Sequence, residues 1–277
     1  MASSPVNDAL PVFRKHAAFN ANVSSFEELM IKGEAQDTWV GLCEKVGQFL
    51  ATTRKNFGTE GVEKVFPNVS IGTQSVLGEW IKKVNNSWDD SLKTIIPARR
   101  MNDEISERMR ARGMEAAKLM ENTNFVNLGN LLTKNVQLLS GQPDVQVNFA
   151  ATELVEGPLG LDTALFLADV LIKYHQLLRL EHNIRYVTSD CAKSFGRAFD
   201  EEMNSNEADQ KKYWNQTSFL TGWEIIRRAT EDQALLERSQ HGEVELVDVF
   251  EAGLRLVSNR NIDNINFMIV VALAEIF

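Results

Sequence analysis

Arginine is concentrated in one short segment of the chain, ARRMNDEISERMRARG, at residues 98–113. Its five arginines are Arg99, Arg100, Arg108, Arg110 and Arg112. Guanidinium groups gathered in this way can neutralise phosphates, so the segment is typical of a surface that binds a polyanion. A carboxylate four residues away can instead form an ion pair with such a guanidinium group, as Glu104 can with Arg108. Arg110 and Arg112 have no acidic residue four positions before them, so both interpretations stay open.

A second basic cluster lies among aromatic residues in the C-terminal half. Arg227 and Arg228 follow Trp223. Two lysines at 211–212 precede two aromatic residues at 213–214. Cations beside aromatic rings can hold single-stranded nucleic acid, because the rings stack on bases while the cations follow the phosphates. An amphipathic helix has the same composition when its rings face inward and its basic side chains cover the rim. The sequence favours the amphipathic interpretation without excluding the other.

The sequence lacks the motifs of common catalytic and cofactor chemistry. It contains no P-loop, dinucleotide-binding glycine motif, zincin motif or nucleophile elbow, and none of its four histidines follows a glutamate by three residues. His175, His182 and Cys191 carry atoms that zinc can bind, but a histidine at the edge of an apolar helix is usually structural. We therefore expect no metal, no cofactor and no enzymatic activity.

The excess of acidic residues lies entirely in the second half of the chain. Residues 1–150 contain 17 Lys and Arg against 17 Asp and Glu, whereas residues 151–277 contain 12 against 21, a net charge of −9. This asymmetry suits halves that contact different partners, or copies that associate head to tail, and it also suits a plainly acidic surface. Because the sequence shows no secretory leader and no run of 18 apolar residues, we expect a cytoplasmic protein without a membrane segment.

Apolar residues recur with helical spacing through the first half. Ser24 and Glu27 have capping-box spacing at the start of the first helix, and Gly33 is a typical helix end. A polar arm, residues 1–22, precedes this helix. The spacing predicts helices over residues 24–33, 37–58, 70–88, 98–120 and 124–141.

The pattern changes near residue 143. Alternating apolar residues predict a strand over 143–149, and the segment EGPLG at 156–160 is a strong breaker of regular structure. Helical spacing then resumes over residues 161–183, 189–203, 207–242, 244–258 and 261–277. The helix at 161–183 is apolar on nearly all sides, which is typical of a bundle centre. The apolar end of the last helix must be buried in its own core or against a neighbouring copy.

These elements predict an all-α protein of two helical lobes with short connections and at most one minor strand pair. The arm at 1–22 leads into an N-terminal lobe at 23–142. A connection at 143–160 then leads to an acidic C-terminal lobe at 161–277. A groove between two such lobes would place the arginine-rich helix where an extended ligand can lie.

One short segment carries a resemblance to a known family. The sequence SFGRAFDEE, at residues 194–202, is similar to the Phe-Asp core segment of flexuous plant-virus coat proteins. The resemblance covers nine residues. The sequence departs from the family's pattern on either side of this segment, so the resemblance does not identify the family of the chain.

Three function classes follow from the sequence. The first is a nucleocapsid-like or coat-like protein that binds single-stranded RNA. Copies of such a protein would assemble into a homo-oligomer. Its RNA-binding residues would be Arg227, Arg228 and the five arginines of 98–113. The second is a helical scaffold or adaptor that binds protein alone, and the third is an all-helical enzyme or carrier for an anionic or lipid-like ligand. The acidic isoelectric point of about 5.1 counts against the first class.

Overall fold

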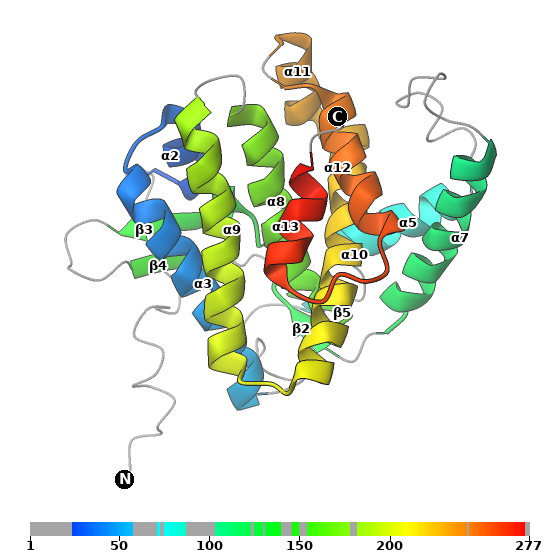
Figure 1. Ribbon diagram of the computed structural model, residues 1–277, viewed down its shortest axis with the longest axis horizontal. Coiled ribbons are helices and arrows are strands. Elements are labelled where there is room, and N and C mark those ends of the chain that lie inside the picture. Colours follow the sequence, from blue (N-terminus) through cyan, green and yellow to red (C-terminus); the bar gives the residue numbers. More distant parts are fainter. Residues whose placement is uncertain are drawn as a thin grey trace.

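Helices account for most of the computed structural model (Figure 1), which confirms the predicted all-α class. The model describes residues 24–57, 71–72, 75–86, 103–122, 125–129, 131–139, 146–149, 154–177, 182–242 and 244–274. The predicted arm at 1–22 lies outside these residues. The helices are α2 (Phe26–Lys32), α3 (Gln36–Phe57), α5 (Val76–Asn86), α7 (Asp103–Met120), α8 (Leu161–Leu177), α9 (His182–Met203), α10 (Glu207–Glu231), α11 (Gln233–Gln240), α12 (Leu246–Ser258) and α13 (Ile265–Leu273).

Short strands form two small sheets, which is more strand than the single pair that the sequence predicts. In one sheet β5 lies between β1, which runs parallel to it, and the antiparallel β2; in the other, β3 pairs with β4 in antiparallel register. Their bounds are β1 (Ile71–Gly72), β2 (Phe125–Asn127), β3 (Val136–Leu139), β4 (Gln146–Phe149) and β5 (Leu154–Gly157). Because β4 falls within the predicted strand at 143–149, that prediction is confirmed.

The predicted helix over 124–141 is wrong, since the structure places β2, a 3-10 turn and β3 there. Gly129 has a φ of 67°, a left-handed conformation that interrupts a right-handed helix. The backbone amides of Leu128 and Gly129 donate to the carboxylate of Asp162 at 2.9 and 3.0 Å. A buried carboxylate far along the chain thus replaces the helical hydrogen bonds of this segment, and helical spacing alone does not reveal it.

The first described helix begins one residue later than predicted. Ser25, not Ser24, is the N-cap of α2: its hydroxyl accepts from the amide of Glu28, and the Glu28 carboxylate accepts from the amide of Ser25. This register points Phe26 into the core. The predicted end at Gly33, with a φ of 67°, is confirmed.

The hydrophobic core draws on both predicted lobes. Helix α3 packs along α9, and both contribute to one cluster of buried residues that also includes α8, α10 and α12 (Figure 1). A Cβ added at Gly47 of α3 would lie 2.3 Å from the carbonyl oxygen of Phe195 of α9, so these helices approach very closely. Helix α8 is buried on almost every side, as predicted. The division into two lobes is therefore not confirmed.

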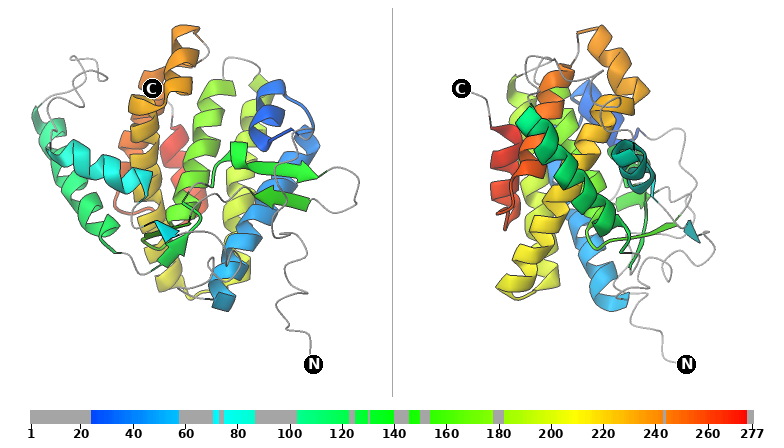
Figure 2. Two further views of the ribbon diagram at one scale, coloured as in Figure 1. Left: turned by 180° about the vertical axis from the view of Figure 1, so that it is seen from behind. Right: turned by 90° about the vertical axis from the view of Figure 1, so that its right-hand side faces the viewer.

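The strands gather on the face of the molecule opposite α13 (Figure 2). The outer helix α13 buries Met268, Ile269 and Ala272 and exposes Phe267 and Val270, which are 38% and 64% accessible. Among the described helices, none combines the length and the apolarity that crossing a membrane requires.

Candidate nucleic-acid interface

The described arginines of the 98–113 segment occupy two different environments. Arg99 and Arg100 lie outside the described residues. Arg108 and Arg110 are exposed on α7, and the guanidinium of Arg108 pairs with Glu104 at 3.1 Å. Arg110 forms no ion pair within the described part of the chain. The salt-bridged interpretation thus applies to Arg108, while Arg110 remains open to solvent.

Arg112 is buried instead of facing solvent. Its Nε donates to the carbonyl oxygen of Val257 at 2.7 Å, and its Nη1 lies 2.5 Å from a carboxylate oxygen of Glu115. The guanidinium also lies over the ring of Phe219, 4.4 Å from its centroid. These contacts tie α7 to α12 and α10, so Arg112 stabilises the packing of three helices.

The second predicted cluster is likewise engaged within the chain. Arg227 forms two hydrogen bonds with the carboxylate of Glu224, at 2.8 and 2.7 Å. Arg228 is buried between Asp169 and Asp232, and its Nε lies 2.9 Å from the latter. Burial opposes the charge of Arg228, but the carboxylates of Asp169 and Glu224 outweigh burial and raise its pKa.

The three aromatic residues of this second basic cluster face inward. Trp214 and Trp223 are almost fully buried, and Tyr213 is buried as well. The arrangement matches the amphipathic interpretation for Arg227 and Arg228. Contact of any of these arginines with RNA stays a prediction.

Among the described residues, no three His, Cys, Asp or Glu side chains form a metal-binding group. His175 is buried, and burial followed by the nearby charge of Arg255 lowers its pKa to about 4. Burial, then contact with Cys191, raises the pKa of the Cys43 thiol. The side chain of His182 lies outside the described set. The expected lack of a metal stays a prediction.

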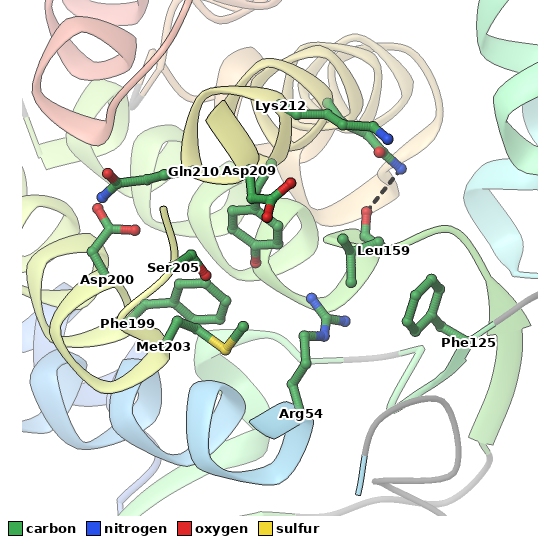
Figure 3. A pocket seen from close by; sticks show the side chains of 12 residues that line it. Arg54, Phe125, Leu159, Phe199, Asp200, Met203, Ser205, Asp209, Gln210 and Lys212 are labelled. Carbon is green, nitrogen blue, oxygen red and sulfur yellow. Dashed lines mark hydrogen bonds between the residues drawn. The ribbon is translucent and has the colours of Figure 1, made fainter. Parts of the chain in front are cut away.

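A pocket of about 310 Å³ lies where the end of α3, the α9–α10 turn and β2 meet (Figure 3). Figure 3 shows the side chain of Arg54 rising from α3 into this space, with Phe125 on one side and Phe199 and Met203 on the other. Lys212 and Asp209 come from the first turns of α10. The pocket thus combines the half-buried guanidinium of Arg54 with aromatic and apolar side chains and with the charged side chains of Asp200, Asp209 and Lys212.

The guanidinium of Arg54 contacts rings instead of carboxylates. Its central carbon lies 5.4 Å from the ring centroid of Phe125 and 5.8 Å from that of Tyr213. Within the described residues Arg54 forms no ion pair. The charge of Arg54 acts on the nearby carboxyl group of Asp162. Burial raises the pKa of Asp162 to about 6, and the positive charge of Arg54 is among the effects that oppose this rise.

The walls of the Arg54 pocket are held in place by a second set of contacts. The rings of Phe199 and Tyr213 stack at 4.7 Å with an angle of 10° between them, and the Tyr213 hydroxyl lies 2.6 Å from that of Thr163. The indole of Trp214 donates to both carboxylate oxygens of Asp200, at 2.9 and 3.0 Å. These contacts fix the side chains of Phe199, Tyr213 and Asp200 in the walls of the pocket.

Two residues of this pocket, Phe199 and Asp200, belong to the segment SFGRAFDEE. Arg54 and Phe125 were not singled out by the sequence. A basic residue in the last turn of a helix is common, and Phe125 lies in the segment wrongly predicted to be helical. Only the fold brings these residues, about 70 positions apart, to one site.

No protein-family model matches the chain, and no curated protein matches it significantly. The functional argument therefore depends on the residues of the Arg54 pocket and their surroundings.

Proposed function

We propose that this protein is a self-assembling, single-stranded RNA-binding protein of the nucleocapsid or coat type, and that the Arg54 pocket receives one nucleotide. The observation that carries the proposal is a half-buried arginine between two aromatic rings, without an ion pair in the described chain. A phosphate would supply the missing anion, and a base would stack on the exposed part of a ring. Such contacts tolerate any sequence, as a protein that coats RNA requires.

The proposal moves the main RNA contact away from the arginine-rich helix. Arg112 and Arg228 are buried against partners in the same chain, so the proposal gives them a structural role. The exposed Arg108 and Arg110 serve as outer contacts to the RNA backbone. Arg99 and Arg100 keep the phosphate-binding role that the sequence predicts.

Self-assembly is supported by the outer face of α13. Phe267 and Val270 lie one turn apart there and expose apolar surface to water. Covering such surface with a neighbouring copy is favourable, because apolar area leaves water. Copies that line up along one RNA strand would cover this face repeatedly.

Replacing Arg54 tests the RNA-binding proposal. We expect Arg54→Gln to weaken binding of a fluorescein-labelled nonauridylate about 5- to 150-fold, because a lost cation and its stacked ring contact are worth about 1–3 kcal/mol. Fluorescence anisotropy at 50 and 200 mM salt measures the change. Lys118→Gln, an exposed change on α7, is the matched control and should bind as the wild-type protein does. A wild-type protein that fails to bind, or an Arg54→Gln protein of unchanged affinity, contradicts the proposal.

The size of the Arg54 pocket favours one competing function, a carrier for a small anionic ligand. A volume of about 310 Å³ lies at the lower end of small-molecule pockets. Uridine monophosphate separates the two functions. A carrier would bind the monophosphate as tightly as the nonauridylate, whereas an RNA-coating protein gains affinity with length. Light scattering during the titration reports whether oligomers form.

A further inference from the structure

A second pocket, of about 610 Å³, adjoins the first along α9. Asp200 lines both pockets, so they are adjacent. Lys193 and Arg197 of α9 form one wall of the second pocket, and Asn264 and Asn266, at the start of α13, form another. We call it the Arg197 pocket.

The Arg197 pocket exists because α13 begins directly against α9. Gly196 makes this approach possible: a Cβ at that position would lie 2.5 Å from a side-chain carbon of Ile265. Gly196 falls between the two cations in the sequence, and any larger residue there would push the start of α13 outward. Close packing at this glycine thus allows residues at the start of α13 to line the same pocket as the cations of α9.

The charges of the Arg197 pocket leave cations available to a ligand. Arg197 is exposed and forms no ion pair within the described part of the chain. Lys193 lies 3.3 Å from Asp190, with 43% and 60% of the two side chains accessible, and exposed pairs of this kind exchange readily with other anions. The carboxylate of Asp200 is occupied by the indole of Trp214. Of the two acids in this pocket, neither blocks the guanidinium of Arg197.

We infer that the Arg197 pocket is a second phosphate subsite, which holds the continuation of the same RNA strand that enters the Arg54 pocket. Lys193 and Arg197 lie one turn apart on α9, so they face the same side and can contact successive parts of one backbone. Val40 and Ile265 supply apolar surface beside them, and the asparagine amides can hydrogen-bond to sugar or base. This inference depends on the proposed function, because it extends the path of the RNA.

RNA length separates the two subsites experimentally. Uridine monophosphate is short enough to occupy the Arg54 pocket alone, because that pocket receives one nucleotide, whereas a nonauridylate reaches both pockets. The double variant Lys193→Gln/Arg197→Gln should bind the monophosphate as the wild-type protein does and the nonauridylate about tenfold more weakly. The slope of log affinity against log salt for the nonauridylate should fall by about 1.4, since each lost phosphate contact on a single strand contributes about 0.7. Lys118→Gln/Lys134→Gln, two exposed lysines outside both pockets, is the control.

Each outcome decides between the two proposals. Equal loss of affinity for the monophosphate and the nonauridylate would mean that the two pockets are one site, and no loss for either would remove Lys193 and Arg197 from the path; both results overturn the second subsite. If Arg54→Gln still weakens binding in those cases, the proposed function stands. Failure of the wild-type protein to bind the nonauridylate overturns both. Circular dichroism melting of each variant confirms that the fold is retained.

Discussion

The same residue type has opposite surroundings in two regions of this molecule. At the centre, Arg228 is enclosed by Asp169 and Asp232, and nearby Lys173 pairs with Glu27. At the end of α3, Arg54 lies beside two aromatic rings and forms no ion pair among the described residues. The difference shows that an arginine is a candidate ligand site when the chain itself does not supply the anion. The number of arginines in a short segment does not reveal whether the chain supplies an anion to each of them.

The central network should carry a large part of the stability. Asp169→Asn leaves the buried Arg228 and Lys173 without their shared carboxylate, so we expect the free energy of unfolding to fall by about 3–5 kcal/mol. Urea denaturation followed by tryptophan fluorescence measures the change. Arg54→Gln, at the other region, should cost under about 1 kcal/mol, because its charge has no partner to lose. Equal destabilisation by the two substitutions would abolish the distinction between the regions.

Two buried aspartates should make stability depend on pH in opposite directions. Burial raises the folded-state pKa of Asp162 to about 6, so its contribution is fully present below its unfolded pKa near 4 and is lost as the pH rises through about 6. Because folding raises the pKa of Asp162 from about 4 to about 6, this contribution is about 3 kcal/mol. Burial alone would raise the pKa of Asp169, but the charges of Arg228 and Lys173 outweigh burial and lower this pKa. Its contribution is therefore present above about pH 4 and is lost at lower pH.

Unfolding free energies measured from pH 3 to 8 test these signs. We expect the wild-type protein to gain stability from pH 7 to 5 and to lose it below pH 4. Asp162→Asn should remove the gain and keep the loss, while Asp169→Asn should do the reverse. Parallel curves for the wild-type protein and Asp162→Asn would show that Asp162 does not titrate as its burial implies.

Much of the helical fold follows from the sequence, because amphipathic spacing and end signals are local. The stripe of α3 and the end of α2 at Gly33 are both found in this way. The segment from β2 to β3 is not, since the Asp162 carboxylate that satisfies its backbone lies more than 30 residues away. The two-lobe division is not confirmed: Gly47 permits close packing of α3 on α9, and nothing local in the sequence distinguishes that glycine.

The candidate site is less predictable than the fold. The sequence singles out arginines by their density, and the structure encloses Arg112 and Arg228 among partners in the same chain. Arg54 has no distinguishing neighbours in the sequence, yet the fold brings Phe125 and Tyr213 to it. Which charge stays without a partner is decided by tertiary packing, and residue spacing carries little information about that.

Photochemical cross-linking tests the central claim most directly. A nonauridylate carrying 4-thiouridine, irradiated in complex with the wild-type protein, should attach to peptides that contain Phe125 and Tyr213, the rings beside Arg54. Peptide mass spectrometry locates the attachment, and Arg54→Gln should reduce its yield. Cross-links confined to α7, or a yield that does not respond to Arg54→Gln, would contradict an RNA site in the Arg54 pocket.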